Sequence, residues 1–335
     1  MKRNIYLKTI PPAEAVARVK ASIDREALIR EETIPSHEAS GRVLAHAVHA
    51  RYSSPTFHSA AMDGYAVNAR STFAAREGHP LTLKAGETCF AVNTGHPMPE
   101  GCDAVIMIEQ VVLDGGSVTI EAPAFPWQHV RRIGEDIVAT ELLFPRNHQL
   151  RPWDVGALLS GGIWDVPVWE RVTVRIIPTG DEVLDFTTHP DPGKGQVVES
   201  NSQMLAALAR ELGCVVERAA PVPDNPEALH QALKDSLDAG RHLTIFCAGS
   251  SAGSKDFTRA TLEKEGEILT HGIAAMPGKP SLLANCRGRL VAGAPGYPVS
   301  ALVCFKELLE PLISWLSHRE PPAKTVVPVE LTRTV

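Results

Sequence analysis

The sequence predicts a multidomain protein of the α/β plus β class, in which a helical domain carries an inserted, mostly β domain and precedes a three-layer α/β domain with a mainly parallel sheet. Three observations support this prediction. Apolar residues recur at helical spacing in residues 11–29, and residues 44–138 are short β-prone runs interrupted by glycine and proline. From residue 171 onward, β-branched runs alternate with amphipathic segments, a rhythm typical of parallel strands covered by helices on both faces.

The first 170 residues divide into helical ends and a β middle. Residues 151–162 have a helical pattern like residues 11–29, so the β domain is expected to be an insertion into a helical layer. Strands are expected at 64–67, 104–108 and 117–120. The expected domain boundaries are 1–45 and 146–170 for the helical domain and 46–145 for the β domain.

Residues 171–320 are expected to form the α/β domain. Gly213 is a suitable helix stop, and Pro226 suits the first position of a helix. Residues 321–335 are expected to begin a further β element. The predicted strands of the α/β domain are 172–177, 214–222, 243–247, 268–276 and 290–293, and its predicted helices are 202–212, one that begins near Pro226, 257–264 and 299–316.

Composition and charge disfavour several classes of protein. The 335 residues carry a formal charge of −6 without any run of Lys and Arg, which disfavours nucleic acid as a partner. No apolar stretch reaches the roughly eighteen residues of a membrane span, and Pro11 and Pro12 interrupt the start of the chain, so a cytoplasmic protein without membrane contact is expected. The six cysteines form no CxxC pair, which disfavours a disulfide or zinc framework.

The loops that follow the predicted parallel strands are the candidate ligand site, because open α/β sheets bind ligands at the carboxyl ends of their strands. These loops read PTGDE after the first strand, PD after the second, GSSAGSKD after the third and APGYP after the last. If the strands are parallel, all four loops line one crevice. They occupy residues 178–182, 223–224, 249–256 and 294–298.

Residues 248–254 are all Gly, Ala or Ser, so backbone amides can approach a ligand closely, and a loop that leads into a helix N-terminus favours phosphate. A tight strand-to-helix turn with Asp256 as the helix cap explains the same residues equally well when the loop is considered alone. The loop is not a Walker P-loop, because three residues instead of four separate Gly249 and Gly253 and because Asp follows Lys255.

Acidic residues accompany these loops. Glu182, Asp224 and Asp256 are suited to bind Mg²⁺ through oxygen or to transfer a proton beside a phosphate. The alternatives are that Asp224 only caps a helix and that Glu182 is solvated. Lys279 lies between two prolines in PGKP, where it is either a ligand cation or a solvated turn residue.

Two glycine-containing loops of the β domain lead into strands. They read AMDGYAV, which contains Asp63, and NTGHPMPEGCDAV, which contains Thr94. The spacing of these residues does not by itself indicate a reaction, and Asp63 taken alone is a typical turn residue.

Eight motifs occur in a fixed order between about residues 10 and 320: AMDGYAV, NTGHPMPEGCDAV, RRIGEDI, PTGDEV, ESNSQML, SSAGSKDFT, MPGKP and PGYPVSA. Together they resemble the molybdopterin molybdenumtransferase family, which includes the MoeA proteins and the E domain of gephyrin. The resemblance implies an elongated homodimer with a helical linker and dimerisation domain, a MogA-like molybdopterin-binding α/β domain and a C-terminal β domain of which this chain holds only the start.

The implied reaction is the Mg²⁺-dependent insertion of molybdate into adenylylated molybdopterin with release of AMP, and the implied pathway partner is a molybdopterin-adenylylating protein. The active site would lie where the α/β domain of one subunit faces the β domain of the other. Asp63, Thr94 and Asp136 would face it from the partner. Glu182, Asp224 and Asp256 would hold Mg²⁺ and carry the acidic chemistry, and the substrate-binding residues would be Thr94, Gly249, Ser250, Ser251, Gly253, Ser254, Lys279, Pro295, Gly296 and Ser300.

The chain departs from the family pattern at several cationic positions. Met276 and Gly272 stand where family members commonly have lysine, and Tyr297 stands where they have the Asn of PGNPVS. A thioether does not replace a cation beside an oxyanion. The alternatives to an enzyme are therefore a non-catalytic molybdopterin-binding sensor or carrier, and an assembly module that binds no pterin. An enzyme should need Asp256 for turnover, whereas a binding protein should tolerate its removal.

Overall fold

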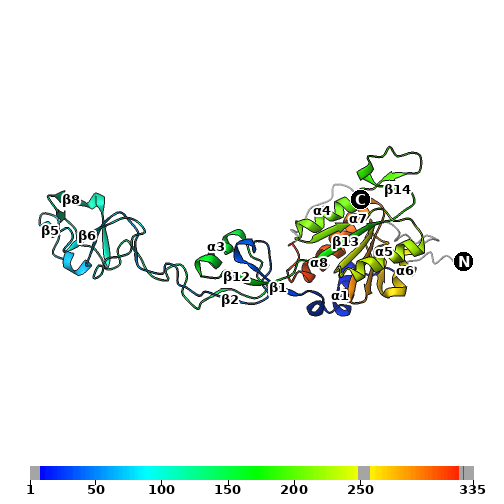
Figure 1. The fold of residues 1–335 in the computed structure, drawn as a ribbon, viewed down its shortest axis with the longest axis horizontal. Helices are drawn as coiled ribbons and strands as arrows, with labels where there is room; N and C mark the ends of the chain where they lie inside the picture. The colour runs from blue at the N-terminus through cyan, green and yellow to red at the C-terminus, as the bar shows by residue number, and fades with distance from the viewer. Residues whose placement is uncertain (1–7, 248–256, 324–326, 328–335) are drawn as a thin grey trace.

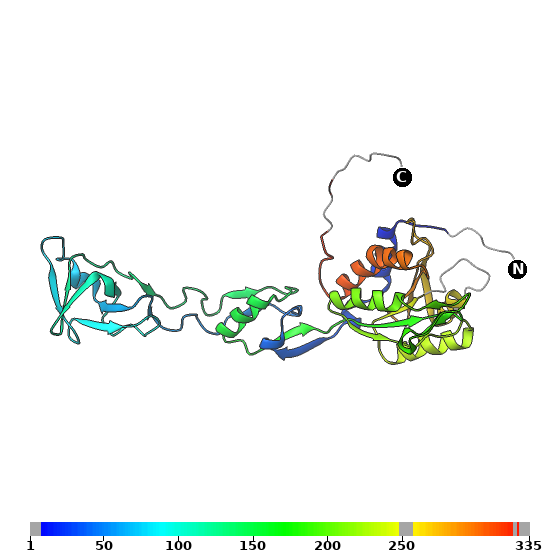
Figure 2. The ribbon, with the colours of Figure 1, turned by 90° about the horizontal axis from the view of Figure 1, so that it is seen from above.

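The computed structural model describes residues 8–247, 257–323 and 327. Three parts follow one another along the longest axis of the elongated molecule (Figure 1). A β-rich part lies at one end, a middle part with one helix follows, and an α/β body lies at the other end (Figures 1 and 2). The chain runs from the body through the middle part to the β-rich end and then returns, because the outgoing and returning segments pair as antiparallel strands.

A six-stranded sheet forms the centre of the α/β body, in the order β16-β13-β17-β20-β19-β18. The first four strands are parallel to one another, and β19 is antiparallel to both of its neighbours, β20 and β18. The sheet predicted as mainly parallel is therefore mixed. The strands are β13 (Thr173–Pro178), β16 (Val215–Arg218), β17 (Leu243–Cys247), β18 (Gly266–His271), β19 (Leu282–Cys286) and β20 (Arg289–Ala294).

Strand β19 is absent from the sequence-based prediction, which was wrong to leave the segment between residues 276 and 290 without a strand. Only Arg287 and Gly288 connect β19 to β20, and both have positive φ, 52° and 78°. A two-residue connection with this backbone joins neighbouring antiparallel strands, and it cannot make the crossover that a parallel pair requires. The antiparallel edge of the sheet therefore follows from this turn.

Helices cover both faces of the sheet, as the alternation of strands and helices predicts. Neighbouring strand residues face opposite ways: Ile176 and Ile245 lie in one buried cluster, and Ile177 and Phe246 lie in the other. The first cluster packs against α1 (Pro12–Ser22), α4 (Asn201–Glu211), α7 (Pro298–Cys304), a π-helical turn (Phe305–Leu309) and α8 (Glu310–Leu316). The second cluster packs against α5 (Pro226–Asp238) and α6 (Phe257–Glu265).

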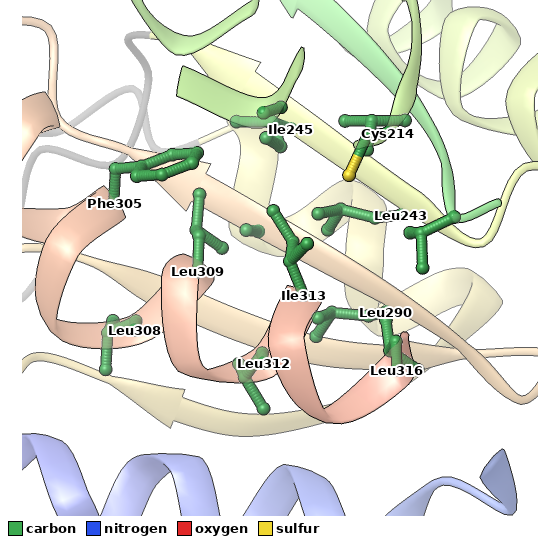
Figure 3. Close-up of a cluster of buried hydrophobic side chains, with 14 of the residues drawn as sticks. Cys214, Leu243, Ile245, Leu290, Phe305, Leu308, Leu309, Leu312, Ile313 and Leu316 are labelled. Carbon is green, nitrogen blue, oxygen red and sulfur yellow. The ribbon is translucent and has the colours of Figure 1, made fainter. Parts of the chain in front are cut away.

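The last helical segment supplies much of the first cluster. Phe305, Leu309 and Ile313 lie four residues apart beside Leu243 and Ile245 of β17 (Figure 3). Each of these five side chains is at most 1% exposed. This spacing gives the segment one continuous apolar face.

Helix α1 packs on the α/β body, although its sequence belongs to the segment predicted as the helical domain. Ala15 and Val19 are fully buried in the same cluster as Leu308 and Leu312. The predicted domain boundaries stay a prediction, but the apolar face of α1 is buried by the body. The other short helical elements before the β-rich part are α2 (Arg25–Leu28) and η1 (Ser36–Glu38).

The middle part contains one helix and a two-stranded sheet. Helix α3 (Pro152–Ser160) lies within the predicted 151–162. Strand β1 (Glu31–Pro35) pairs with β12 (Asp165–Trp169). This segment is therefore less helical than predicted, because Ile34, Val166 and Val168 are sheet residues that pack under α3 with Leu158.

Two three-stranded antiparallel sheets form the β-rich part, with the orders β6-β4-β7 and β5-β9-β8. The predicted strands at 64–67 and 117–120 are confirmed as β4 (Gly64–Val67) and β9 (Ser117–Ile120). Strand β7 (Ala104–Met107) ends one residue earlier than predicted. The remaining elements of this part are β3 (Ser59–Ala60), η2 (Ala69–Thr72), β5 (Leu81–Lys84), β6 (Cys89–Val92), η3 (Ile108–Gln110), β8 (Val111–Asp114) and β10 (Val130–Arg131). The middle part also holds β2 (Val48–His49) and β11 (Leu142–Phe144), which pair with each other.

A stacked pair of rings joins the middle part to the α/β body. The rings of Trp169 and His318 are 3.8 Å apart and nearly parallel, at 6°. The indole Nε1 of Trp169 donates to Asn147 Oδ1 at 2.9 Å, and the guanidinium of Arg146 lies 5.2 Å from the Trp169 ring centre. The orientation of the middle part therefore depends on a buried histidine.

His318 is expected to make the protein less stable in acid. Burial, together with the positive charge of Arg25, lowers the pKa of His318 from 6.5 to about 4. The folded protein therefore favours the neutral imidazole, and the free energy of unfolding should fall as pH decreases below about 6.5, by about 2 kcal/mol at pH 5. Urea denaturation at pH 7.5 and pH 5 tests this.

His318→Asn is the matched variant, because φ at this position is 54° and Asn tolerates the left-handed region. The variant should lose a large part of the pH dependence between 7.5 and 5. An unchanged pH dependence in the variant would assign the acid sensitivity to other groups.

Candidate active site

The candidate site lies at the carboxyl edge of the four parallel strands. Because β13, β16, β17 and β20 are parallel, their carboxyl ends lie at one edge of the sheet, and the described loops after β13, β16 and β20 begin there, as the sequence predicts. Gly180 N donates to Val222 O at 3.1 Å, which joins the first two loops. Asn201 Nδ2 donates to Gly296 O at 2.7 Å, which joins the start of α4 to the last loop.

The loop after β17 falls outside the described residues. The predictions for Gly249, Ser250, Ser251, Gly253, Ser254 and Asp256 therefore stay predictions. The three other loops contain the remaining predicted residues of this edge, except Lys279 and Ser300.

Two predicted acids lie on adjoining loops of this edge. Glu182 is exposed, and Asp224 is half-buried just before α5. The side chain of Asp181 connects their loops, because its Oδ1 accepts the backbone N–H of Asp224 at 3.1 Å. The sequence analysis did not single out Asp181, since nothing in the spacing distinguishes it from Glu182.

Gly180 allows the turn that carries Glu182. Its φ is 138°, and a Cβ built at this position would lie 2.8 Å from Val183 Cγ2 and 3.0 Å from Glu182 Cδ. Any larger residue would therefore displace the Glu182 side chain or strain the backbone. The glycine of PTGDE thus has a steric reason that the sequence pattern alone does not give.

A buried charge network, which sequence reasoning missed, holds the segment that follows Glu182, residues 183–202. Arg218, near the end of β16, donates to Ser202 Oγ at 2.9 Å, to Asp185 Oδ1 at 3.1 Å and to Glu199 Oε2 at 3.4 Å. Glu199 is only 5% exposed and also accepts the backbone N–H of Ser202 at 2.7 Å.

This network links three elements that follow Glu182. They are the two-stranded pair β14 (Val183–Leu184) and β15 (Val197–Val198), the turn η4 (Phe186–Thr188) and the start of α4. The backbone N–H of Thr187, followed by the guanidinium of Arg218, lowers the pKa of Asp185. The ESNS motif contributes Glu199 and Ser202, but Arg218 carries no motif and is identified only by the fold.

Lys279 and Ser300 come from two segments that pack against each other. Gly278 is buried with φ of 111°, and a Cβ there would lie 3.0 Å from Val303 Cγ1 of α7. Lys279 is exposed, and Ser300 is half-buried in the first turn of α7. The loop before α7 holds buried Pro295 and exposed Gly296.

Met276 and Tyr297 belong to the same two segments. Met276 is 87% exposed and Tyr297 is 81% exposed. Large apolar side chains therefore lie in solvent on the segments that carry Lys279 and Ser300.

The β-rich part brings Asp63 and Thr94 together. Asp63 Oδ1 accepts the backbone N–H of Thr94 at 2.7 Å and its hydroxyl at 3.0 Å. These two hydrogen bonds, the backbone one first, lower the pKa of Asp63. Gly64 permits this arrangement, because a Cβ there would lie 2.0 Å from Ile106 O of the neighbouring strand.

Asp136 is held by an arginine. Both of its carboxylate oxygens lie 2.5 Å from Arg131 Nη2, and its backbone N–H donates to Ser54 O at 2.9 Å. Its charge is therefore partly neutralised within the chain.

The two groups of predicted residues lie at opposite ends of the molecule. Asp63 and Thr94 belong to the β-rich end, and Glu182 and Asp224 belong to the α/β body (Figure 1). One chain does not bring them together, so a single site that contains both groups requires a second copy of the chain.

Thr94→Val is expected to raise the pKa of Asp63 toward its ordinary value, because the change removes the hydroxyl donor and keeps the backbone donor. NMR titration of the Asp63 carboxyl carbon measures this shift. Thr82→Val, which alters a threonine on β5 instead, is the control. A pKa of Asp63 that is the same in all three proteins would contradict the hydrogen-bond explanation.

The described residues contain no group of three His, Cys, Asp or Glu side chains that could hold a metal ion. All six cysteines are free thiols. Within the part of the chain that the structure describes, no helix is long and apolar enough to cross a membrane.

Comparison with known proteins identifies the class to which this fold and site belong. A family described as the MoeA N-terminal region (domain I and II) matches residues 10–162, and a family described as a probable molybdopterin binding domain matches residues 175–315. The chain is thus a protein of molybdenum cofactor biosynthesis.

Individual relatives define the family more closely. The chain is 34% identical to the molybdopterin molybdenumtransferase of Haemophilus influenzae over 86% of this chain and 74% of that protein. It is also 34% identical to molybdopterin molybdenumtransferase 2 of Mycobacterium tuberculosis, over 84% and 74%. The crystal structure of the MoeA molybdopterin biosynthesis protein from Pyrococcus horikoshii matches with a TM-score of 0.79 and 29% identity, over 93% of this chain and 81% of that one. The chain belongs to the molybdopterin molybdenumtransferase family.

Proposed function

We propose that this protein inserts molybdate into adenylylated molybdopterin with Mg²⁺-dependent release of AMP, in a site shared between two copies of the chain. The observation that carries the proposal is the separation of the two residue groups. Asp63 and Thr94 lie at one end of the molecule, and the carboxyl-edge loops lie in the body at the other end (Figure 1). Two chains that pair with opposite polarity would bring each β-rich end to the carboxyl edge of the other.

The residues of the carboxyl edge suit an anionic substrate. Glu182 and Asp224 offer hard carboxylate oxygens, and Mg²⁺ usually binds through one or two carboxylates plus substrate phosphates, so these residues fit the ion. When bound, Mg²⁺ would neutralise the phosphate charge that opposes loss of AMP. Lys279 would supply the positive charge for the oxyanion. Asp63, kept ionised by its hydrogen bonds from Thr94, would provide a fixed acceptor opposite these groups.

The middle part would hold the two chains together. Four large apolar side chains are exposed there: Tyr52 by 45%, Leu142 by 54%, Trp153 by 68% and Trp164 by 55%. Exposed apolar side chains in this number are typical of an interaction surface, and tryptophans often dominate the binding energy of such surfaces. We therefore propose a homodimer formed by this part.

The double variant Trp153→Ser, Trp164→Ser tests the dimer. Its dimer dissociation constant, measured by sedimentation equilibrium, should rise by about tenfold or more. Phe125→Ser, which removes a 71% exposed aromatic from the β-rich part, should leave the constant unchanged. A monomer in all three proteins would refute the homodimer.

Mixing two inactive variants tests the shared site directly. Asp63→Asn and Glu182→Gln should each release AMP from adenylylated molybdopterin very slowly in the presence of molybdate and Mg²⁺. After subunit exchange, half of the dimers contain one chain of each kind and one fully intact site, so activity should return to about one quarter of the wild-type value. The absence of recovery, despite demonstrated exchange, would place both residues in sites within a single chain.

A second candidate function is a molybdopterin-binding sensor or carrier that does not catalyse the reaction. This function is supported by Met276 and Tyr297, which are exposed at the positions where the family pattern has a lysine and an asparagine. Under this alternative, the wild-type protein binds adenylylated molybdopterin without release of AMP, and Met276→Lys restores the release. Prompt release by the wild-type protein would exclude it. In either case the substrate would come from a molybdopterin-adenylylating protein.

A further inference from the structure

A cavity of about 410 Å³ lies at the junction between the α/β body and the middle part. The body contributes Lys20 from α1, Arg25 from α2, and His318 and Arg319 after α8. The returning segment contributes Asn147 and Gln149. Arg319 reaches the carbonyl of Leu212, which lies just before β16, so the cavity is at the amino-terminal edge of the parallel strands, opposite to the candidate active site.

Two buried polar groups of this cavity have no hydrogen-bond partner among the described residues. His318 is only 5% exposed, and neither of its ring nitrogens makes a hydrogen bond. The nearest carboxylate oxygen, from Glu26, is 3.9 Å from His318 Nδ1. The Nε of Arg319 is buried and unpaired as well. Buried donors normally have a partner, so these groups indicate a missing ligand.

The charges around the cavity favour an anion. The cations Lys20, Arg25 and Arg319 line it, and Glu320 is the one acid in the lining. Arg25 is paired with Glu26 at 2.9 Å, whereas among the described residues neither Lys20 nor Arg319 forms an ion pair, and Arg319 donates only to the neutral carbonyl of Leu212.

The charged groups that act on His318 have opposing effects on its pKa. Arg25 and Arg146 oppose protonation of His318, and Glu26 and Glu31 favour it. An anion in the cavity would shift this balance toward the imidazolium.

We propose that this cavity binds the phosphate group of a small molecule or a free phosphate ion, through His318 and Arg319 as donors and Lys20 and Arg25 as charges. The volume exceeds that of a phosphate ion and lies in the range of small-molecule sites, which leaves room for a phosphomonoester. The ligand touches both the body and the returning segment, so it would fix the angle between them beside the Trp169–His318 stack.

Calorimetric titration of the whole protein with inorganic phosphate and with AMP, at pH 7 and constant ionic strength, is the first test. Saturable binding of either probe is expected, and AMP binding that is tighter than phosphate binding and is weakened by Lys20→Gln would identify a phosphomonoester as the ligand. Lys20→Gln should weaken binding by about three- to tenfold, because it removes one uncompensated charge. Lys234→Gln, which removes an exposed lysine of α5, should not change the affinity. Absence of saturable binding, or equal affinity in the two variants, would overturn the proposal.

The second test uses sulfate, which stays doubly charged between pH 5 and pH 8. Sulfate should raise the pKa of His318 measured by NMR, and its affinity should increase as pH falls toward 5, because the bound anion favours the imidazolium. His318→Asn should abolish this pH dependence. A His318 pKa that does not move with sulfate would overturn the assignment. The Lys20→Gln variant and the pKa of His318 report on the junction itself, so these two readouts are separate from AMP or phosphate bound at the carboxyl edge.

Discussion

Glu182→Gln is expected to lower the rate of AMP release from adenylylated molybdopterin by about two to three orders of magnitude. The substitution keeps the size of the side chain and removes its charge, so it removes a carboxylate that we propose to bind Mg²⁺ or transfer a proton. The substitution should change the free energy of unfolding little, because Glu182 is exposed and the Gly180 that its turn requires is kept. A single-turnover assay, with molybdate and Mg²⁺ at concentrations that saturate the wild-type protein, measures the effect.

Two controls separate a chemical role of Glu182 from a binding role. Glu211→Gln removes an exposed acid at the far end of α4 and should leave the rate unchanged. Raising the Mg²⁺ concentration should rescue part of the rate if Glu182 binds the ion, and it should have no effect if Glu182 transfers a proton. A rate within twofold of the wild-type value would exclude Glu182 from the reaction.

Leu312→Ala is expected to destabilise the α/β body by about 2–5 kcal/mol, because it leaves a cavity in a closely packed core. Leu312 is fully buried in the cluster that joins α1, α8 and the sheet (Figure 3). Urea unfolding followed by circular dichroism at 222 nm reports on the body, which holds most of the helices. Val215→Ala, at a residue of β16 in the same body that is 50% exposed, is the control and should cost far less. Similar costs in the two variants would contradict the burial argument.

The sequence predicts the α/β body well where local pattern and tertiary structure agree. Strand β17 is predicted without error, since a run of apolar residues that is buried on both faces gives a clear signal. Helix α5 begins at the predicted Pro226, where Asn225 accepts the backbone N–H of Ala228. Local signals decide these elements, so no knowledge of distant contacts is needed.

The sequence-based predictions are wrong where contacts between distant residues determine the position or the length of an element. The position of α1 on the body depends on a surface that residues 282–316 create much later in the chain. Strand β16 (Val215–Arg218) is shorter than the predicted 214–222, because its regular pairing with β13 is interrupted after Ala219 and resumes only in the bridge between Val222 and Thr179. Neither outcome is visible in a local window of sequence.

The candidate site shows the same division. Parallel strands were sufficient to predict that the loops of Glu182, Asp224 and Gly296 share one edge. The Arg218 network was not predictable, because Arg218, Asp185 and the Glu199–Ser202 pair come from three separate segments that become neighbours only through the fold. His318 likewise has no motif, and its importance comes from its position against Trp169.

The chain passes through the middle part twice, so the β-rich part is connected to the α/β body only through this narrow segment. Outgoing and returning strands run together through this part (Figure 1). The Trp169–His318 stack joins it to the α/β body. A small rotation of the middle part relative to the α/β body would therefore displace Asp63, at the far end of the molecule, by a much larger distance. The position of Asp63 relative to the α/β body therefore depends in part on this stack, and substitutions of His318 are expected to shift Asp63 without contacting it.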